Sequence, residues 1–216
     1  MATSKLVFWA VDVQRDFILP GGKLYAPGAE KLIPNIQRLV RGAAEAGVLI
    51  VSSGDFHSEN DPEFSTFPPH CVRGTPGAQI LPEAMTKDYY TIANDPSQLL
   101  PSDVVRHAQI IFEKQTLDVF DNPHVDELVE RLESDAEYVV FGVVTEFCVR
   151  CAAKGLLARR RKVFVVTDAT EALRSEDGRR ALGELQALGA QLITTDEALH
   201  AIRAATINRR TPTIRI

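Results

Sequence analysis

Hydrophobic residues along this chain fall into short uninterrupted runs that alternate with stretches of helical periodicity. An uninterrupted run predicts a strand covered on both faces, whereas apolar residues three and four apart predict an amphipathic helix. Strands are expected at residues 5–13, 47–55, 108–114, 136–144, 162–169 and 190–197. Helices are expected at residues 29–46, 123–134, 146–159, 176–188 and 196–204.

The alternation predicts an α/β fold of three layers, α/β/α, with a central, mostly parallel six-stranded sheet. Gly47 and Gly189 stand where a helix should end and the next strand begin, which supports these boundaries. Residues 56–107 interrupt the pattern, because they are rich in Pro, Gly, Asp and His and lack periodicity. A loop of that length inside a compact domain is usually functional. We see no linker or repeat and expect residues 1–216 to form a single domain.

The composition is that of a soluble globular protein. Of the 216 residues, 45% are hydrophobic and 25% are charged, and the formal net charge is -5. This balance gives no electrostatic footprint for nucleic acid or an anionic membrane, so neither is an expected partner. The apolar run near the N-terminus is too short to span a bilayer, and three cysteines argue against a disulfide framework. We therefore expect a cytoplasmic protein.

Residues able to carry chemistry stand where four of the predicted strands end. They are, in order along the chain, Asp12, Asp55, Lys114 and Cys148. In open α/β sheets, ligands bind beyond the carboxyl ends of the strands. Taken singly, each residue is more often a turn former, a solvated cation or a packed thiol. Their arrival at one edge of the sheet nevertheless predicts an active site.

Cys148 and Cys151 form a C-x-x-C motif that allows three interpretations: a redox pair, half of a zinc site, or one reactive cysteine. Thr145 is a suitable N-cap, which would place Cys148 at the third helical position, where the helix dipole favours a thiolate. Cys151 lies beyond the first turn, among residues typical of a packed helix face. The chain lacks the second C-x-x-C that a zinc site would need. We therefore expect Cys148 to be the nucleophile and Cys151 to be structural.

A second group of candidate residues lies between residues 55 and 70. Asp55, His57 and His70 are suitable metal ligands, and Glu63 is a candidate fourth. The D-x-H spacing places two of them on the same side of an extended segment. Two or three protein ligands with open positions are typical of a metal that holds a bound molecule. The alternative is a solvated polar loop with an Asx turn.

Five stretches resemble the isochorismatase-like cysteine hydrolases, in the same order along the chain. They are VDVQRDF, GDFH, FPPHCVRGTPGA, FEK and GVVTEFCV. The D-x-Q-x-D-F and G-x-x-T-x-x-C patterns are the superfamily signals, and D-x-H followed by P-x-H-C-x-x-G-T-x-G-A looks most like nicotinamidases. The resemblance covers roughly residues 5–200.

Carried over by position, the resemblance implies that Asp12, Lys114 and Cys148 form a catalytic triad. It also implies a cis peptide bond between Val143 and Val144. That bond would direct the N–H groups of Val144 and Cys148 into an oxyanion hole.

The resemblance further implies a divalent metal ion and an aromatic pocket. The implied ligands are Asp55, His57 and His70, with Glu63 at a position that varies among family members. Zinc is expected, and manganese or iron suits the same donors. The expected substrate contacts are Phe17, Phe67, Val144 and Phe147.

The implied reaction is metal-dependent hydrolysis of nicotinamide, a small amide, to nicotinate and ammonia through a cysteine thioester. Three departures from the family pattern concern the pocket. Phe147 stands where some nicotinamidases carry a His, Phe67 replaces a Trp, and residues 115–123, QTLDVFDNP, differ from the Tyr-rich and Gly-rich version of several nicotinamidases. The alternative is an amidohydrolase of the same superfamily that acts on an N-carbamoyl or ureido amide without metal. A silent binding protein on the same fold and a thiol redox protein are further alternatives.

The C-terminal residues 206–216 have the sequence TINRRTPTIRI. This segment suits an edge strand that pairs within the same subunit or with another one. A homo-oligomer is therefore an open expectation.

Overall fold

The computed structural model describes residues 5–210, with side chains described up to residue 202. Its strands are β1 (Leu6–Val11), β2 (Leu49–Asp55), β3 (Tyr89–Ile92), β4 (Gln109–Lys114), β5 (Glu137–Val143), β6 (Lys162–Glu171) and β7 (Gln191–Ile193). Its α-helices are α1 (Arg15–Ile18), α2 (Ile33–Glu45), α3 (Val125–Arg131), α4 (Arg150–Ala158), α5 (Ser175–Ala187) and α6 (Thr195–Arg210). Gly47 and Gly189 have φ values of 64° and 104°, so they end α2 and α5 in the left-handed conformation as expected.

The strands form one parallel sheet in the order β3-β4-β2-β1-β5-β6-β7. The chain starts at the centre with β1, adds strands on one side, and then continues on the other side from β5. The strand order therefore reverses at β1, and the loops beyond β1 and β5 diverge there. Such a switch point opens a crevice at the carboxyl ends of the strands.

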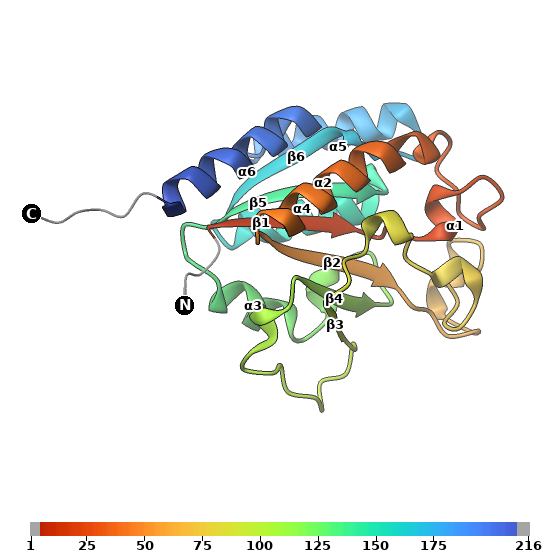
Figure 1. The fold of residues 1–216 in the computed structure, drawn as a ribbon. Helices are drawn as coiled ribbons and strands as arrows, with labels where there is room; N and C mark the ends of the chain where they lie inside the picture. Colours follow the sequence, from red (N-terminus) through yellow and green to blue (C-terminus); the bar gives the residue numbers. More distant parts are fainter. Residues whose placement is uncertain (1–4, 211–216) are drawn as a thin grey trace, which may run out of the picture.

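Helices cover both faces of the sheet, as the uninterrupted apolar runs predict (Figure 1). In β1, Leu6, Phe8 and Ala10 join the core beneath α2 and α6. The alternate residues Val7 and Trp9 join the core on the opposite face, which packs against α3, α4 and α5. Because every residue of β1 faces a hydrophobic core, the strand shows no polar alternation.

The expected three-layer fold is confirmed, but the expected number of six strands is wrong. The additional strand is β3, which lies in the segment 56–107 that was expected to be a loop. It is a short edge strand in which Tyr89, Tyr90 and Thr91 are exposed, so it lacks the apolar run that marks the other strands. Pairing with β4, rather than its own pattern, makes it a strand.

Several element boundaries also differ from expectation, and two examples involve the start of a helix. The helix expected at 29–46 begins as a 3-10 turn, Ala29–Leu32, before α2. The strand expected at 190–197 ends at Ile193, because α6 starts at Thr195.

The C-terminal segment is helical where the structure describes it. Helix α6 continues to Arg210, so residues 206–210 do not form the expected edge strand, and residues 211–216 lie outside the described residues. Among the described helices, none combines the length and the apolar character that crossing a bilayer requires.

Candidate active site

The carboxylate of Asp12 lies at the carboxyl end of β1. Its φ of 49° is left-handed, a conformation that Asp adopts more readily than most residues. Ser53 Oγ on β2 donates a 2.6 Å hydrogen bond to Asp12 Oδ1, and Asp12 N donates to Ser53 O at 3.2 Å. Asp12 Oδ2 contacts Lys114 instead. The first strand thus delivers a fixed, fully buried carboxylate.

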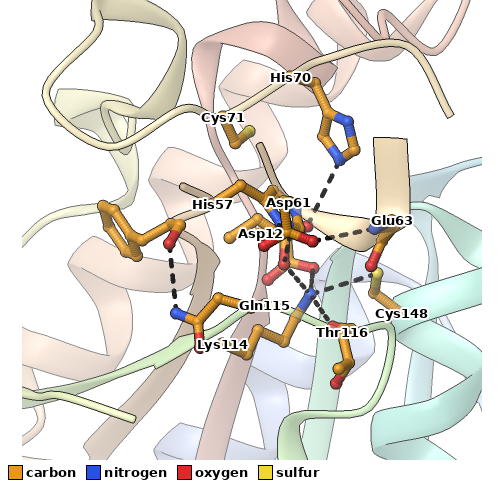
Figure 2. Close-up of polar contacts among 12 residues, drawn as sticks. Asp12, His57, Asp61, Glu63, His70, Cys71, Lys114, Gln115, Thr116 and Cys148 are labelled. Carbon is orange, nitrogen blue, oxygen red and sulfur yellow. Dashed lines mark hydrogen bonds and ion pairs between the residues drawn. The ribbon is translucent and has the colours of Figure 1, made fainter. Parts of the chain in front are cut away.

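The ammonium group of Lys114 lies at the centre of the site (Figure 2). Its Nζ is 2.5 Å from Asp55 Oδ1, 2.9 Å from Asp12 Oδ2 and 3.5 Å from Cys148 Sγ. The strand register pairs Lys114 with Asp55, which explains why the two side chains meet. Burial acts to lower the pKa of Lys114, but the Asp12 and Asp55 carboxylates outweigh it and hold that pKa well above its usual value. Lys114 is therefore a fixed cation.

Cys148 lies in a π-helical turn, Thr145–Val149, which precedes α4. The expectation that Thr145 caps this helix is wrong, because Val144 is the N-cap residue and no side chain caps it. Cys148 is accordingly the fourth residue of the turn, not the third of a regular helix. Cys151 follows in α4 and is half-buried. From this turn, Cys148 Sγ lies 3.5 Å from Lys114 Nζ, as the shared strand edge predicts.

The helix start was expected to favour a thiolate at Cys148, and burial acts against that form. Burial raises the pKa of the Cys148 thiol well above its usual value. The Lys114 ammonium acts to lower that pKa, while the Asp12 and Asp55 carboxylates raise it further. Desolvation of the thiolate thus exceeds the help from the cation and the helix terminus. Cys148 needs a base, and an Asp12 oxygen lies within 4.8 Å of its sulfur.

Asp55, His57 and His70 converge as expected, with one ligand atom from each within 4.8 Å of the others. His57 Nδ1 contacts Asp61 Oδ2 at 3.1 Å, and His70 Nδ1 contacts the carbonyl oxygen of Pro68 at 2.8 Å. A carbonyl oxygen only accepts, so His70 carries its proton on Nδ1 and leaves the Nε2 lone pair free. The two Nε2 atoms lie 3.9 and 4.0 Å from Asp55 oxygens.

These separations fit a metal ion rather than direct hydrogen bonds. A distance near 4 Å is too long for a hydrogen bond, and the buried Nε2 of His57 has no hydrogen-bond partner among the described residues. Two imidazole nitrogens and a carboxylate match the donors that zinc and related divalent metals accept. The donor set therefore fits the expected cation.

Asp61 is a site residue that the sequence analysis missed. Its carboxylate accepts from Glu63 N at 3.0 Å, which starts the 3-10 turn Pro62–Ser65, and it holds His57 Nδ1 as well. Its position before Pro62 is a signal for such a cap. Glu63 lies outside the three-ligand cluster but lines the adjacent cavity, where burial raises its pKa.

The D-x-Q-x-D-F motif near the N-terminus fixes the segments that carry the metal-type ligands. The Gln14 side chain donates to Asp55 O at 2.6 Å and accepts from Asp55 N at 2.8 Å, which fixes the end of β2. Asp16 accepts from Cys71 N at 2.8 Å, which fixes the turn after His70. A Cβ at Gly77 would lie about 2.1 Å from the Asp16 carboxylate, so this close approach requires glycine.

The expected substrate contacts line a single cavity beside Cys148. They are Phe17, Phe67, Val144 and Phe147. The Phe67 and Phe147 rings meet edge to face with centroids 5.4 Å apart. The cavity measures about 20 Å³, room for roughly one water molecule. The expected cis peptide bond between Val143 and Val144 is present.

Three leucines also line this cavity, and the sequence analysis did not identify them as site residues. They are Leu24, Leu117 and Leu173. They come from three separate segments and carry no local signal that distinguishes them from ordinary core residues.

The isochorismatase domain family matches this chain at residues 6–95 and 93–197. The chain belongs to the isochorismatase family. The match spans both the segment with Asp12 and the metal-type ligands and the segment with Lys114 and Cys148.

Similar proteins within the family include nicotinamidases. A nicotinamidase of Escherichia coli K12 is 26% identical over 207 residues, covering 85% of this chain and 92% of the relative. A nicotinamidase/pyrazinamidase of Mycobacterium tuberculosis is 28% identical over 190 residues, covering 85% and 95%. The solved structure of a pyrazinamidase of Pyrococcus horikoshii in complex with zinc superposes with a TM-score of 0.70 at 29% identity, covering 88% of this chain and 99% of its own. The chain is thus nicotinamidase-like in sequence and in fold.

Proposed function

We propose that this protein is a metal-dependent amidohydrolase that converts nicotinamide to nicotinate and ammonia through a thioester on Cys148. The observation that carries the proposal is the position of Lys114 Nζ, which contacts Asp12, Asp55 and Cys148 at once. The Lys114 ammonium thus contacts the proposed nucleophile, Cys148, and its base, Asp12. It also contacts one of the proposed metal ligands, Asp55. The similarity to nicotinamidases supports the substrate.

The reaction starts from a protonated thiol. Asp12 accepts the Cys148 proton while the sulfur attacks the amide carbon. Lys114 stays charged throughout and stabilises the thiolate as it forms. The N–H groups of Val144 and Cys148 stabilise the oxyanion, each by roughly 3–4 kcal/mol.

Breakdown of the tetrahedral intermediate uses the same proton. Asp12 returns it to the departing nitrogen, and ammonia leaves a thioester on Cys148. Asp12 then takes a proton from the water that opens the thioester and passes it to the departing Cys148 sulfur. The acid product leaves and the thiol is regenerated.

Asp55, His57 and His70 would hold the divalent ion, with Glu63 close to the same position. When bound, the ion supplies a coordination position for a ring nitrogen and so orients the substrate. Zinc is the favoured ion, because the structural neighbour from Pyrococcus horikoshii is a zinc complex. Phe17, Phe67 and Phe147 supply the apolar walls for the ring, and the small cavity requires Phe67 or Phe147 to move when a ring enters.

The test is ammonia release from nicotinamide by the metal-free and the zinc-loaded protein. We expect turnover that depends on metal, that Cys148→Ala abolishes, and that Cys151→Ser leaves nearly unchanged. Cys151→Ser is the matched control, because it removes the neighbouring thiol of the same C-x-x-C. Activity on ureido amides alone, unaffected by a chelator, would instead establish the metal-free alternative. Loss of turnover in Cys151→Ser would favour a redox pair.

A further inference from the structure

A second hollow lies on the surface outside the active-site cavity. It is a groove of about 440 Å³ formed by the start of α1, the segment 74–85, β3 and β4. It shares no lining residue with the cavity beside Cys148. The two regions adjoin at two places. At the end of β2, Phe56 lines the groove and its neighbour Asp55 lines the cavity, and in α1, Arg15 lines the groove and Phe17 lines the cavity.

The residues that line the groove are mostly apolar, and one of them is a cation. The apolar wall comprises Phe56, Ile80, Met85 and Ile111. Arg15 is the one charged residue among the described residues that line the groove. Tyr89 and Thr91 on β3 also line the groove, and both carry a hydroxyl group. The lining is therefore amphipathic and lacks a carboxylate.

Arg15 is held in place through its backbone while its side chain is left uncommitted. Arg15 N donates to Gln79 O at 3.0 Å, and Gln14 forms a β-bridge with Ile80, so the residue is fixed beside the apolar wall. The exposed guanidinium makes no ion pair or hydrogen bond with any other described residue. Many exposed charges on this protein are paired instead, as Arg73 is with Glu113 at 2.8 Å.

The dimensions and the charge define the class of ligand. Small-molecule sites typically measure roughly 300–1,000 Å³ and combine an apolar lining with a few polar groups. A guanidinium presents a planar fork of donors that matches a carboxylate. A cationic ligand would face Arg15 without any compensating acid in the groove.

We propose that this groove binds a small organic anion, with its carboxylate on Arg15 and its apolar or aromatic body against Phe56, Ile80 and Met85. The site is independent of the proposed reaction, because it contains neither the thiol nor a metal ligand.

Nuclear magnetic resonance of the full chain, labelled with nitrogen-15, tests the proposal with three probes: benzoate, benzamide and inorganic phosphate. The readout is the backbone amides of Thr75, Tyr89 and Thr91, which line only the groove, so binding at the active site is distinguished. We expect benzoate to shift these amides with saturation below about 20 mM. Benzamide and phosphate should bind at least about tenfold more weakly, because each lacks one of the two recognised features.

Two variants sharpen the test. Arg15→Gln should weaken benzoate binding at least about tenfold. Arg179→Gln is the matched control, because Arg179 is also exposed and unpaired among the described residues but lies on α5, and it should leave binding unchanged. Equal binding of benzamide or phosphate, equal loss in the control variant, or absence of shifts at the groove amides would each overturn the proposal.

Discussion

Lys114 and Arg15 are two cations placed in opposite surroundings. Lys114 is buried and lies within 3 Å of two carboxylates, whereas Arg15 is exposed beside an apolar groove and has no charged partner among the described residues. Removing a charge from water costs free energy that nearby opposite charges must offset. An exposed guanidinium keeps its hydration and needs no such offset. Burial thus makes Lys114 part of a fixed charged cluster, while exposure leaves Arg15 free to bind an anion.

The largest predicted effect is on stability, after removal of the buried cation Lys114. Lys114→Met leaves Asp12 and Asp55 buried without their cation, so we expect it to destabilise the fold by roughly 3–5 kcal/mol and to abolish turnover. Arg15→Met is the matched variant and should change stability by less than about 0.5 kcal/mol. Urea denaturation of both variants measures the difference. Similar losses in the two variants would contradict the assigned role of burial.

A second prediction concerns the carboxylate that holds a metal-type ligand. Asp61→Asn removes the charge that orients His57, and we expect zinc affinity to fall by roughly 10–100-fold with the fold intact. Asp88→Asn is a matched control, because Asp88 contacts His107 at 2.6 Å in an exposed pair far from the cluster in sequence. Competition with a chelating dye measures both affinities. An unchanged affinity in Asp61→Asn would show that Asp61 serves only to cap the 3-10 turn.

The smallest predicted effect tests whether the two regions act separately. Phe56→Leu reduces the aromatic wall of the groove, so we expect benzoate to bind roughly threefold more weakly. Zinc affinity should stay within about twofold, because Gln14 and Lys114 hold Asp55 independently of the Phe56 ring. Titrations of benzoate and of zinc on the same variant check the two values. A large loss of zinc affinity would show that the regions are coupled through residue 56.

The sequence predicted the candidate site better than it predicted the electrostatics within it. Asp12, Lys114 and Cys148 were expected together because parallel strands end at a common edge, and the structure brings them together. The sequence did not predict the direction in which the pKa of Cys148 shifts. The helix terminus is visible in the sequence, but the desolvation that raises the thiol pKa depends on the surrounding packing.

What the sequence alone determined follows from local patterns. Uninterrupted apolar runs specify strands buried on both faces, and residues at the ends of such strands must share one edge of the sheet. Only the tertiary structure decided that Tyr89–Ile92 is a strand, that Asp61 holds His57, and that Arg15 faces an apolar groove. Each of these outcomes arises from contacts between segments far apart along the chain or outside any periodic run. Periodicity records which face of an element is buried, but it does not record which neighbour that face or loop will meet.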